Sequence, residues 1–209
     1  MWVRSEYAGE LAVLSAWLSA LLPWNVTYSE FGPLGSTLFV RFPFLQVQFT
    51  WLPTVEVDGE VQSFRQTGFE LVQGIWVADP VTAATSPEGV GLNIVGVNVT
   101  WAIGAGVVGL AVLLSLAMYA DEDGVDERLP VDPVRTMGAL LGVGALVLTW
   151  ATWLFVQSDL PGFPIPVGTA LLWVFAYTLL TVERAPATET AVESDGDLDE
   201  GSDAGTDPE

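Results

Sequence analysis

The sequence predicts an all-α membrane protein: a four-helix transmembrane bundle with a long outer loop and an acidic tail. Two observations lead to this fold class. Of the 209 residues, 51% are hydrophobic, yet the formal net charge is −20. Charge and apolarity occupy different stretches, because residues 89–120, 136–158 and 160–182 contain no Asp, Glu, Lys or Arg. Uncharged apolar runs of about 20 residues are long enough to cross the hydrocarbon of a bilayer as a helix.

The first predicted span covers about residues 7–28. Its apolar centre, Leu11 to Trp24, is short, so the helix needs its flanks to reach the about 20 residues of a crossing. A cleaved signal peptide is the alternative. We favour an uncleaved span, because Glu6 and Glu10 do not suit a positively charged leader.

The other three predicted spans cover about residues 91–119, 136–156 and 164–182. The last one opens with Pro164 and Pro166, which a helix tolerates in its first turn. The connections between these spans are short, which predicts antiparallel neighbouring helices. Residues 1–184 therefore form one predicted transmembrane domain.

The predicted outer loop covers residues 29–90 and begins with two extended runs, 36–41 and 44–51. In the second run Gln46, Gln48 and Thr50 alternate with apolar residues, which is the period of a half-buried strand. Pro43 separates the runs and predicts edge strands or a bent ribbon.

The rest of the outer loop begins with a predicted turn around Asp58-Gly59. Within residues 61–83 the apolar side chains recur every three or four positions, which favours an amphipathic helix that ends before Asp79. Such a helix could lie in the membrane interface. A strand through residues 69–77 stays open as an alternative.

Two of the predicted spans carry stripes of small residues at helical spacing. Small residues let helix backbones approach closely, which is how membrane helices associate. We interpret the stripes as packing surfaces inside the bundle, with dimerisation as the alternative. They consist of Ala102, Ala105, Gly106, Gly109, Gly138, Gly142 and Ala145.

The composition excludes several chemistries. The chain has no His, Cys or Lys, which removes the common nucleophile–base pairs, thiolate metal sites and Schiff bases. We assign no catalytic residue, no cofactor and no metal ligand. Four loop carboxylates could at most hold a cation or support a carboxylate-only reaction: Glu56, Asp58, Glu60 and Asp79.

Asn25 and Asn98 each begin an Asn-x-Thr pattern, the acceptor pattern for glycosylation. Asn25 is the better candidate, because it is predicted on the outer side, whereas Asn98 falls at the start of a predicted helix.

The arginines predict the orientation in the cell membrane. With four spans both termini lie on one side, and Arg4, Arg128, Arg135 and Arg184 fall on that side near span ends. The positive-inside rule then places both termini of this multi-pass protein in the cytoplasm. Residues 185–209 are acidic and poor in apolar residues, so we expect a disordered tail. The acidic excess without lysine predicts a halophilic host.

Several blocks of the sequence carry a resemblance to a known family. They are residues 1–11, 21–28, 40–44, 131–135 and 164–168. Together they resemble a family of uncharacterised haloarchaeal membrane proteins, over most of residues 1–183. The resemblance implies a multi-span protein and no assigned activity.

The function that follows is a non-enzymatic membrane protein, an accessory subunit or envelope component. Its predicted partners are the lipid bilayer and a membrane protein or a second copy of the chain, with no nucleic acid. A small transporter or channel component is one alternative. A membrane enzyme that uses only carboxylates is another.

Overall fold

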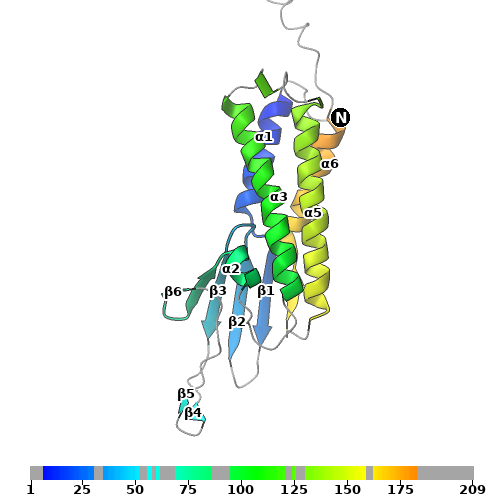
Figure 1. Cartoon of the computed structure of the whole chain (residues 1–209). Coiled ribbons are helices and arrows are strands. Elements are labelled where there is room, and N and C mark those ends of the chain that lie inside the picture. The colour runs from blue at the N-terminus through cyan, green and yellow to red at the C-terminus, as the bar shows by residue number, and fades with distance from the viewer. Residues whose placement is uncertain are drawn as a thin grey trace, which may run out of the picture.

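The molecule combines helices with an antiparallel sheet (Figure 1). The computed structural model describes residues 7–30, 35–51, 56–57, 60–61, 69–85, 95–120, 124–125, 130–158 and 162–182. The predicted all-α bundle is therefore wrong. The predicted acidic tail, residues 185–209, lies outside the described residues.

Two long helices occupy the second and third predicted spans, and both are long and apolar enough to cross a membrane. They are α3 (Val95–Ala120) and α5 (Pro133–Val156), which pack against each other. Asp132 caps α5, because its carboxylate accepts a hydrogen bond from the Val134 amide at 3.0 Å. Pro133 follows at the first helical position, where a missing amide hydrogen costs nothing.

The helices found at the first and fourth predicted spans are shorter than predicted. The first is α1 (Ala8–Leu21), and the chain then enters strand β1 (Asn25–Glu30). The fourth is α6 (Val167–Thr181), which follows strand β8 (Phe163–Ile165). β1 and β8 pair with each other, and this pairing takes both segments out of the helices. Only α3 and α5 among the described helices are long and apolar enough to cross a membrane.

The main sheet has the strand order β6-β7-β3-β2-β1-β8. Its centre is the hairpin of β2 (Ser36–Arg41) and β3 (Gln46–Trp51). The prediction of edge strands around Pro43 is wrong for a physical reason. Pro43 lies in the connection between the strands, where the Phe42 amide donates to the Leu45 carbonyl at 2.7 Å. No ladder hydrogen bond is lost there.

The predicted amphipathic helix in residues 61–83 is also wrong. Residues 69–78 form the strands β6 (Phe69–Val72) and β7 (Ile75–Ala78). The alternative is therefore right about strand structure, but the predicted single strand through residues 69–77 is a hairpin of two. Gly74 makes the tight turn between them with a φ of +80°, which favours glycine. β7 also pairs with β3, so long-range pairing overrides the helical spacing of the apolar residues. Residues 62–68 lie outside the described part.

Two small elements complete the described fold. The strands β4 (Glu56–Val57) and β5 (Glu60–Val61) pair with each other. The turn predicted at Asp58-Gly59 lies outside the described residues. Helix α2 (Pro80–Thr85) follows β7 and packs against α3.

The shorter helices and the main sheet lie along different halves of α3 and α5 (Figure 1). α1 and α6 lie against one half of this pair, and the sheet lies beside the other half. Trp101 of α3 donates its indole N–H to the Phe42 carbonyl at 3.0 Å, which ties the sheet to the helices. The main core is apolar and contains residues of α1, α3, α5 and α6, among them Ala12, Leu141 and Leu172.

Candidate functional site: a buried arginine between sheet and helices

The face of the sheet that points toward the helices is polar. Alternate residues of a strand point to the same face, and directly paired residues share that face. The register aligns Arg41 with Asn25 on one side and with Gln46 on the other. The buried polar residues of this face are Asn25, Thr27, Ser29, Thr37, Arg41 and Gln46. A sheet that packs on helices normally buries its apolar side, so this face needs a specific explanation.

Arg41 organises the polar face. Its Nε donates to Gln46 Oε1 at 2.7 Å. Its Nη1 donates to Asn25 Oδ1 at 3.4 Å and to Thr27 Oγ1 at 3.3 Å. The Thr27 hydroxyl in turn donates to Asn25 Oδ1 at 2.7 Å. Three neutral side chains from two strands therefore accept hydrogen bonds within one network around the guanidinium.

Two aromatic rings also contact the guanidinium. Arg41 Cζ lies 4.8 Å from the ring centroid of Phe39 and 4.7 Å from that of Phe155. Phe39 belongs to the same strand, whereas Phe155 belongs to the last turn of α5. A desolvated cation over an aromatic face gains about 2 kcal/mol. The contact with Phe155 therefore joins the sheet to α5 through the arginine.

Arg41 carries a buried charge without an ion pair in the described part of the chain. Its side chain is 4% exposed, and burial lowers its pKa to about 9. The guanidinium therefore stays protonated at neutral pH. The arrangement supplies a fixed positive charge and hydrogen-bond donors, and the residues that contact it offer no general base or activated nucleophile.

The predicted packing residues fall into two groups. A Cβ added to Gly138 would lie 3.0 Å from Leu179 Cβ, and one added to Gly142 would lie 3.6 Å from Ala176 Cβ. Both positions therefore pack α5 against α6. Ala105 and Ala145 are buried as well, and Ala102 is half-buried.

The other two predicted glycines do not pack between helices. A Cβ added to Gly109 would lie 3.6 Å from the Phe44 ring, so this position faces the β2–β3 hairpin. Gly106 is exposed, and an added Cβ would find nothing within 4 Å. The glycine of α3 with the least room for a side chain was not among the predicted positions. It is Gly104, where an added Cβ would lie 2.6 Å from Leu148 Cδ2.

The two asparagines of the acceptor patterns have structural surroundings. Asn25 is 0% exposed and takes part in the Arg41 network, so a glycan on its amide nitrogen would have to displace that network. Asn98 donates from Nδ2 to the Ala83 carbonyl at 2.9 Å, which ties α3 to α2.

The loop carboxylates do not gather into a site within the described residues. No group of three or more His, Cys, Asp or Glu side chains able to hold a metal ion occurs there. Glu56 and Glu60 lie on β4 and β5, and Asp58 lies outside the described residues. Asp79 instead caps α2, because its Oδ1 accepts from the amides of Val81 and Thr82 at 3.0 and 2.9 Å.

The capping role of Asp79 gives a first prediction. The hydrogen bonds from Thr82 lower the pKa of this exposed carboxyl. A lowered pKa means that the cap contributes stability above the usual pKa near 3.8 and loses it as the pH falls through the lowered value. Asp79→Ala should cost about 1 kcal/mol of unfolding free energy at pH 7, measured by denaturant unfolding in detergent micelles. Asp79→Asn keeps the acceptor and should lose only the pH dependence; an equal loss in both variants would contradict the cap.

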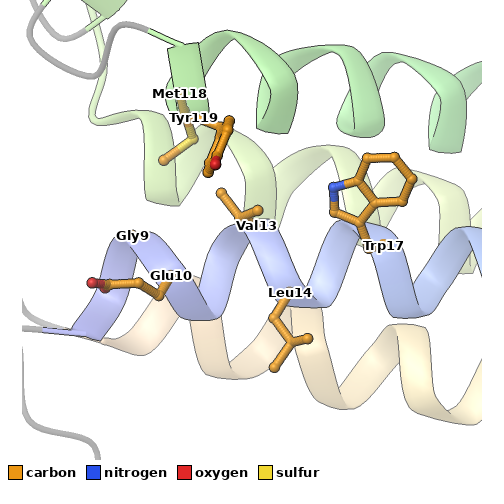
Figure 2. Close-up of a pocket in the computed structure, with 7 residues that line it drawn as sticks. All are labelled: Gly9, Glu10, Val13, Leu14, Trp17, Met118 and Tyr119. Atoms are coloured by element: carbon orange, nitrogen blue, oxygen red, sulfur yellow. The ribbon is translucent and has the colours of Figure 1, made fainter.

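A groove between α1 and α3 opens at the end of the bundle where α1 begins (Figure 2). It holds about 450 Å³, and Met118 and Tyr119 of α3 lie opposite Val13 of α1. Leu14 and Trp17 continue the lining, and Glu10 is its one ionised side chain. A single exposed carboxylate on an apolar groove does not form a catalytic constellation, so the groove is a feature of the apolar surface.

Sequence reasoning did not find the Arg41 site. The available signal was an arginine that directly follows the apolar run Leu38-Phe39-Val40. Alternation then puts Arg41 on the face opposite Leu38 and Val40. Its aromatic partner Phe155 lies on a distant helix, which no local pattern reveals.

Comparison with known proteins supplies a family and no activity. Residues 1–184 match the model of a family that is described as a family of unknown function. No curated protein matches the chain. The match covers every helix and strand described above and leaves residues 185–209 outside. The predicted resemblance to an uncharacterised family is confirmed to that extent.

Proposed function

The chain belongs to a family of unknown function (DUF7549), and we propose that it is an integral membrane protein without enzymatic activity. In this proposal it serves as an accessory subunit or an envelope component. Its first partner is the lipid bilayer. A second membrane protein or another copy of the chain is the partner that an accessory role requires.

The observation that carries the proposal is the apolar outward surface of α3 and α5. In their most apolar windows only 39% and 33% of the residues are buried. The core helix of a water-soluble protein would be mostly buried, with polar residues on its remaining side. Here the exposed side chains are apolar as well: Ile103, Leu110, Leu113, Leu116, Val143, Leu146, Trp150 and Trp153. Such a surface suits hydrocarbon as its solvent.

The flanking helices support the same environment. The exposed residues of α1 include Leu14 and Trp17, and those of α6 include Trp173 and Val174. Only Glu10 and Arg135 are charged in α1, α3, α5 and α6, and each lies in the first turn of its helix. Helices α1 and α6 have 14 and 15 residues, whereas a crossing needs about 20. Only α3 and α5 are therefore long enough to span the bilayer as single helices.

The same geometry supports a proposed orientation in the membrane. Glu10 of α1 lines one groove with Tyr119, and Gly138 of α5 faces Leu179 of α6. α1 therefore begins, and α6 ends, at the end of the bundle that holds the α3–α5 connection (Figure 1). Arg135 lies at this end, and Arg4, Arg128 and Arg184 are close to it in sequence. The positive-inside rule favours a multi-pass protein with this end, and both termini, in the cytoplasm.

The packed interior favours an accessory role over a conducting one. The buried hydroxyls of Ser19 and Ser115 donate to backbone carbonyls of their own helices, at 2.7 Å in both cases. The buried core cluster of the helices consists of Ala, Leu, Val, Met and Trp side chains. A route for ions needs a continuous row of polar groups, and within the described residues the hydroxyls of Ser19 and Ser115 inside the helical bundle each bond only to their own helix. The acidic excess and the missing lysine support a halophilic, haloarchaeal host.

The proposal is tested by a charge on the outward surface. Leu110 is 56% exposed near the middle of α3. Aspartate at the centre of a span costs about 2.5–3.5 kcal/mol, so Leu110→Asp should reduce the membrane-integrated fraction several-fold. The measurement is the fraction that stays in the pellet after an alkaline carbonate wash. Tyr119→Asp, at the end of the same helix, is the control and should integrate normally.

Two results would reject the proposed function. One is wild-type protein that washes off membranes with carbonate. The other is purified protein that stays folded and monodisperse in buffer without detergent.

A further inference from the structure

The sheet turns its apolar side away from the rest of the molecule. Val26 pairs with Val40, Val40 with Val47, and Val47 with Val77. Ile165 of β8 pairs with Val26 and extends this first row. All five side chains point away from the helices, because Arg41, Asn25 and Gln46, which alternate with them, point inward.

A second apolar row follows one pleat further along the strands. It runs through Phe163, Tyr28, Leu38, Phe49 and Ile75. We call these two rows of ten residues the outer sheet face. None of the ten is buried, and Tyr28, Phe163 and Ile165 are more than half exposed. The next row, Glu30, Ser36 and Trp51, brings the first charge.

The lengths of the helices say what covers this face. α3 has 26 residues and measures about 39 Å, whereas α1 with 14 residues measures about 21 Å. The hydrocarbon of a bilayer is about 30 Å thick. If α3 crosses it, about 9 Å of hydrocarbon remains beside α3 where α1 has ended. The outer leaflet must contact whatever lies there.

The sheet fills that position. β1 begins four residues after the end of α1, and β8 ends two residues before α6. A Cβ added to Gly109, in the middle of α3, would lie 3.6 Å from the Phe44 ring of the β2–β3 hairpin, and Arg41 stacks on Phe155 of α5. The sheet therefore follows α1 and α6 along the helix pair (Figure 1). Its first apolar row lies at the strand ends nearest to these two helices.

The sheet also meets the backbone requirement of a lipid contact. Hydrocarbon accepts no unpaired backbone N–H or C=O group. β1, β2, β3 and β7 are each paired on both sides. The edge strand β8 has three residues and includes Pro164, which has no N–H to leave unpaired. Tyr28, Phe163 and Trp51 lie further out, where aromatic rings suit the headgroup layer.

We propose that the outer sheet face rests in the outer leaflet, its first row at the edge of the hydrocarbon and its second row among the headgroups. The sheet thereby completes, beside α3 and α5, the crossing that α1 and α6 leave unfinished. This inference rests on the proposed function, because it assumes that α3 and α5 cross the bilayer.

The test uses spin labels in the whole chain. Because the chain has no cysteine, Val47→Cys, Phe49→Cys, Glu30→Cys and Leu110→Cys each give one labelled site. The variants are reconstituted into phosphatidylcholine vesicles, and collisions of the label with oxygen and with a water-soluble nickel chelate are compared. The ratio of oxygen to nickel collisions at Val47 should be several-fold above that at Glu30 and approach that at Leu110. Phe49 should lie between them.

The outcomes separate this inference from the proposed function. A lipid-like ratio at Leu110 with a water-like ratio at Val47 overturns the inference and leaves the proposed function intact. Few collisions with either reagent at Val47 mean that protein covers the face, which also overturns it. A water-like ratio at Leu110 itself rejects the proposed function.

Discussion

Gly168→Ala is expected to destabilise the fold by about 3 kcal/mol, because a single methyl group has no room there. A Cβ at Gly168 would lie 2.5 Å from the Pro23 carbonyl oxygen and 2.8 Å from Trp24 Cα. Both atoms belong to the backbone between α1 and β1, so no side chain can rotate away. The start of α6 and this connection must move apart.

The movement would also break two hydrogen bonds. The Gly168 amide donates to the Pro23 carbonyl at 3.0 Å, and the Thr169 hydroxyl donates to the Trp24 carbonyl at 3.3 Å. These bonds hold α6 against the point where helix α1 gives way to strand β1. In a chain of this size the loss lowers the melting temperature by roughly 10 °C, measured by circular dichroism in detergent micelles.

Gly106→Ala is the matched control for Gly168→Ala. Gly106 is also a helical glycine, but a Cβ there would meet nothing within 4 Å. Alanine is favoured over glycine in a helix by about 0.5–1 kcal/mol, so this variant should keep or slightly raise the melting temperature. Equal losses in both variants would contradict the packing assigned to Gly168, as would no loss at Gly168.

The parts of the fold that local sequence patterns could predict are α3 and α5. Each apolar run is longer than a crossing needs and contains no charge, so no competing structure is available. Asp132 and Pro133 also mark the start of α5 with ordinary helix signals. These two helices follow from residues within one stretch of chain.

The mixed fold could not be predicted in the same way. Residues 25–30 alternate Asn, Thr and Ser with Val, Tyr and Glu, which is a strand pattern. The first predicted span nevertheless includes residues 25–28, because a crossing helix needs about 20 residues. Their partner strand β8 is more than 130 residues away, and pairing over such a distance leaves no local trace. The length that a membrane-spanning helix requires therefore predicts the wrong helix bounds at α1 and α6.

The candidate site was missed because the polarity of the sheet is reversed. Alternation in residues 46–51 correctly predicts a strand, but it does not say which face is buried. In water the apolar face would be inside, and Gln46 and Arg41 would be solvated. Here the polar face is inside and Arg41 is nearly inaccessible. Only the packing of the sheet on Phe155 and its neighbours decides this.

The second large effect is expected at Arg41, where Arg41→Ala should cost about 3–5 kcal/mol. The substitution leaves a cavity between Phe39 and Phe155 and removes the donor from Gln46 Oε1. Arg41→Met fills most of the same volume and removes the cost of burying a charge. It should therefore lose less than half as much. The measurement is denaturant unfolding of all three proteins in the same detergent.

The pH dependence of the stability difference between wild type and Arg41→Met tests the role of the charge. Burial lowers the pKa of Arg41 to about 9, well below the ordinary pKa that the side chain has in the unfolded chain. Between these values the unfolded state binds more protons than the folded state, so wild-type stability should rise with pH there. Below about pH 8 the side chain is charged in both states, so the difference between wild type and Arg41→Met should stay flat.

Together the two substitutions separate shape from charge at the junction. If Arg41→Met were as unstable as Arg41→Ala, the hydrogen bonds to Gln46, Asn25 and Thr27 would dominate over the filling of space. If the difference between Arg41→Met and wild type changed between pH 5 and 8, another ionisable group would be coupled to Arg41. If Arg41→Met loses little unfolding free energy, and if this loss does not change with pH, then Arg41 holds the sheet against α5 mainly by stacking its planar guanidinium and filling space.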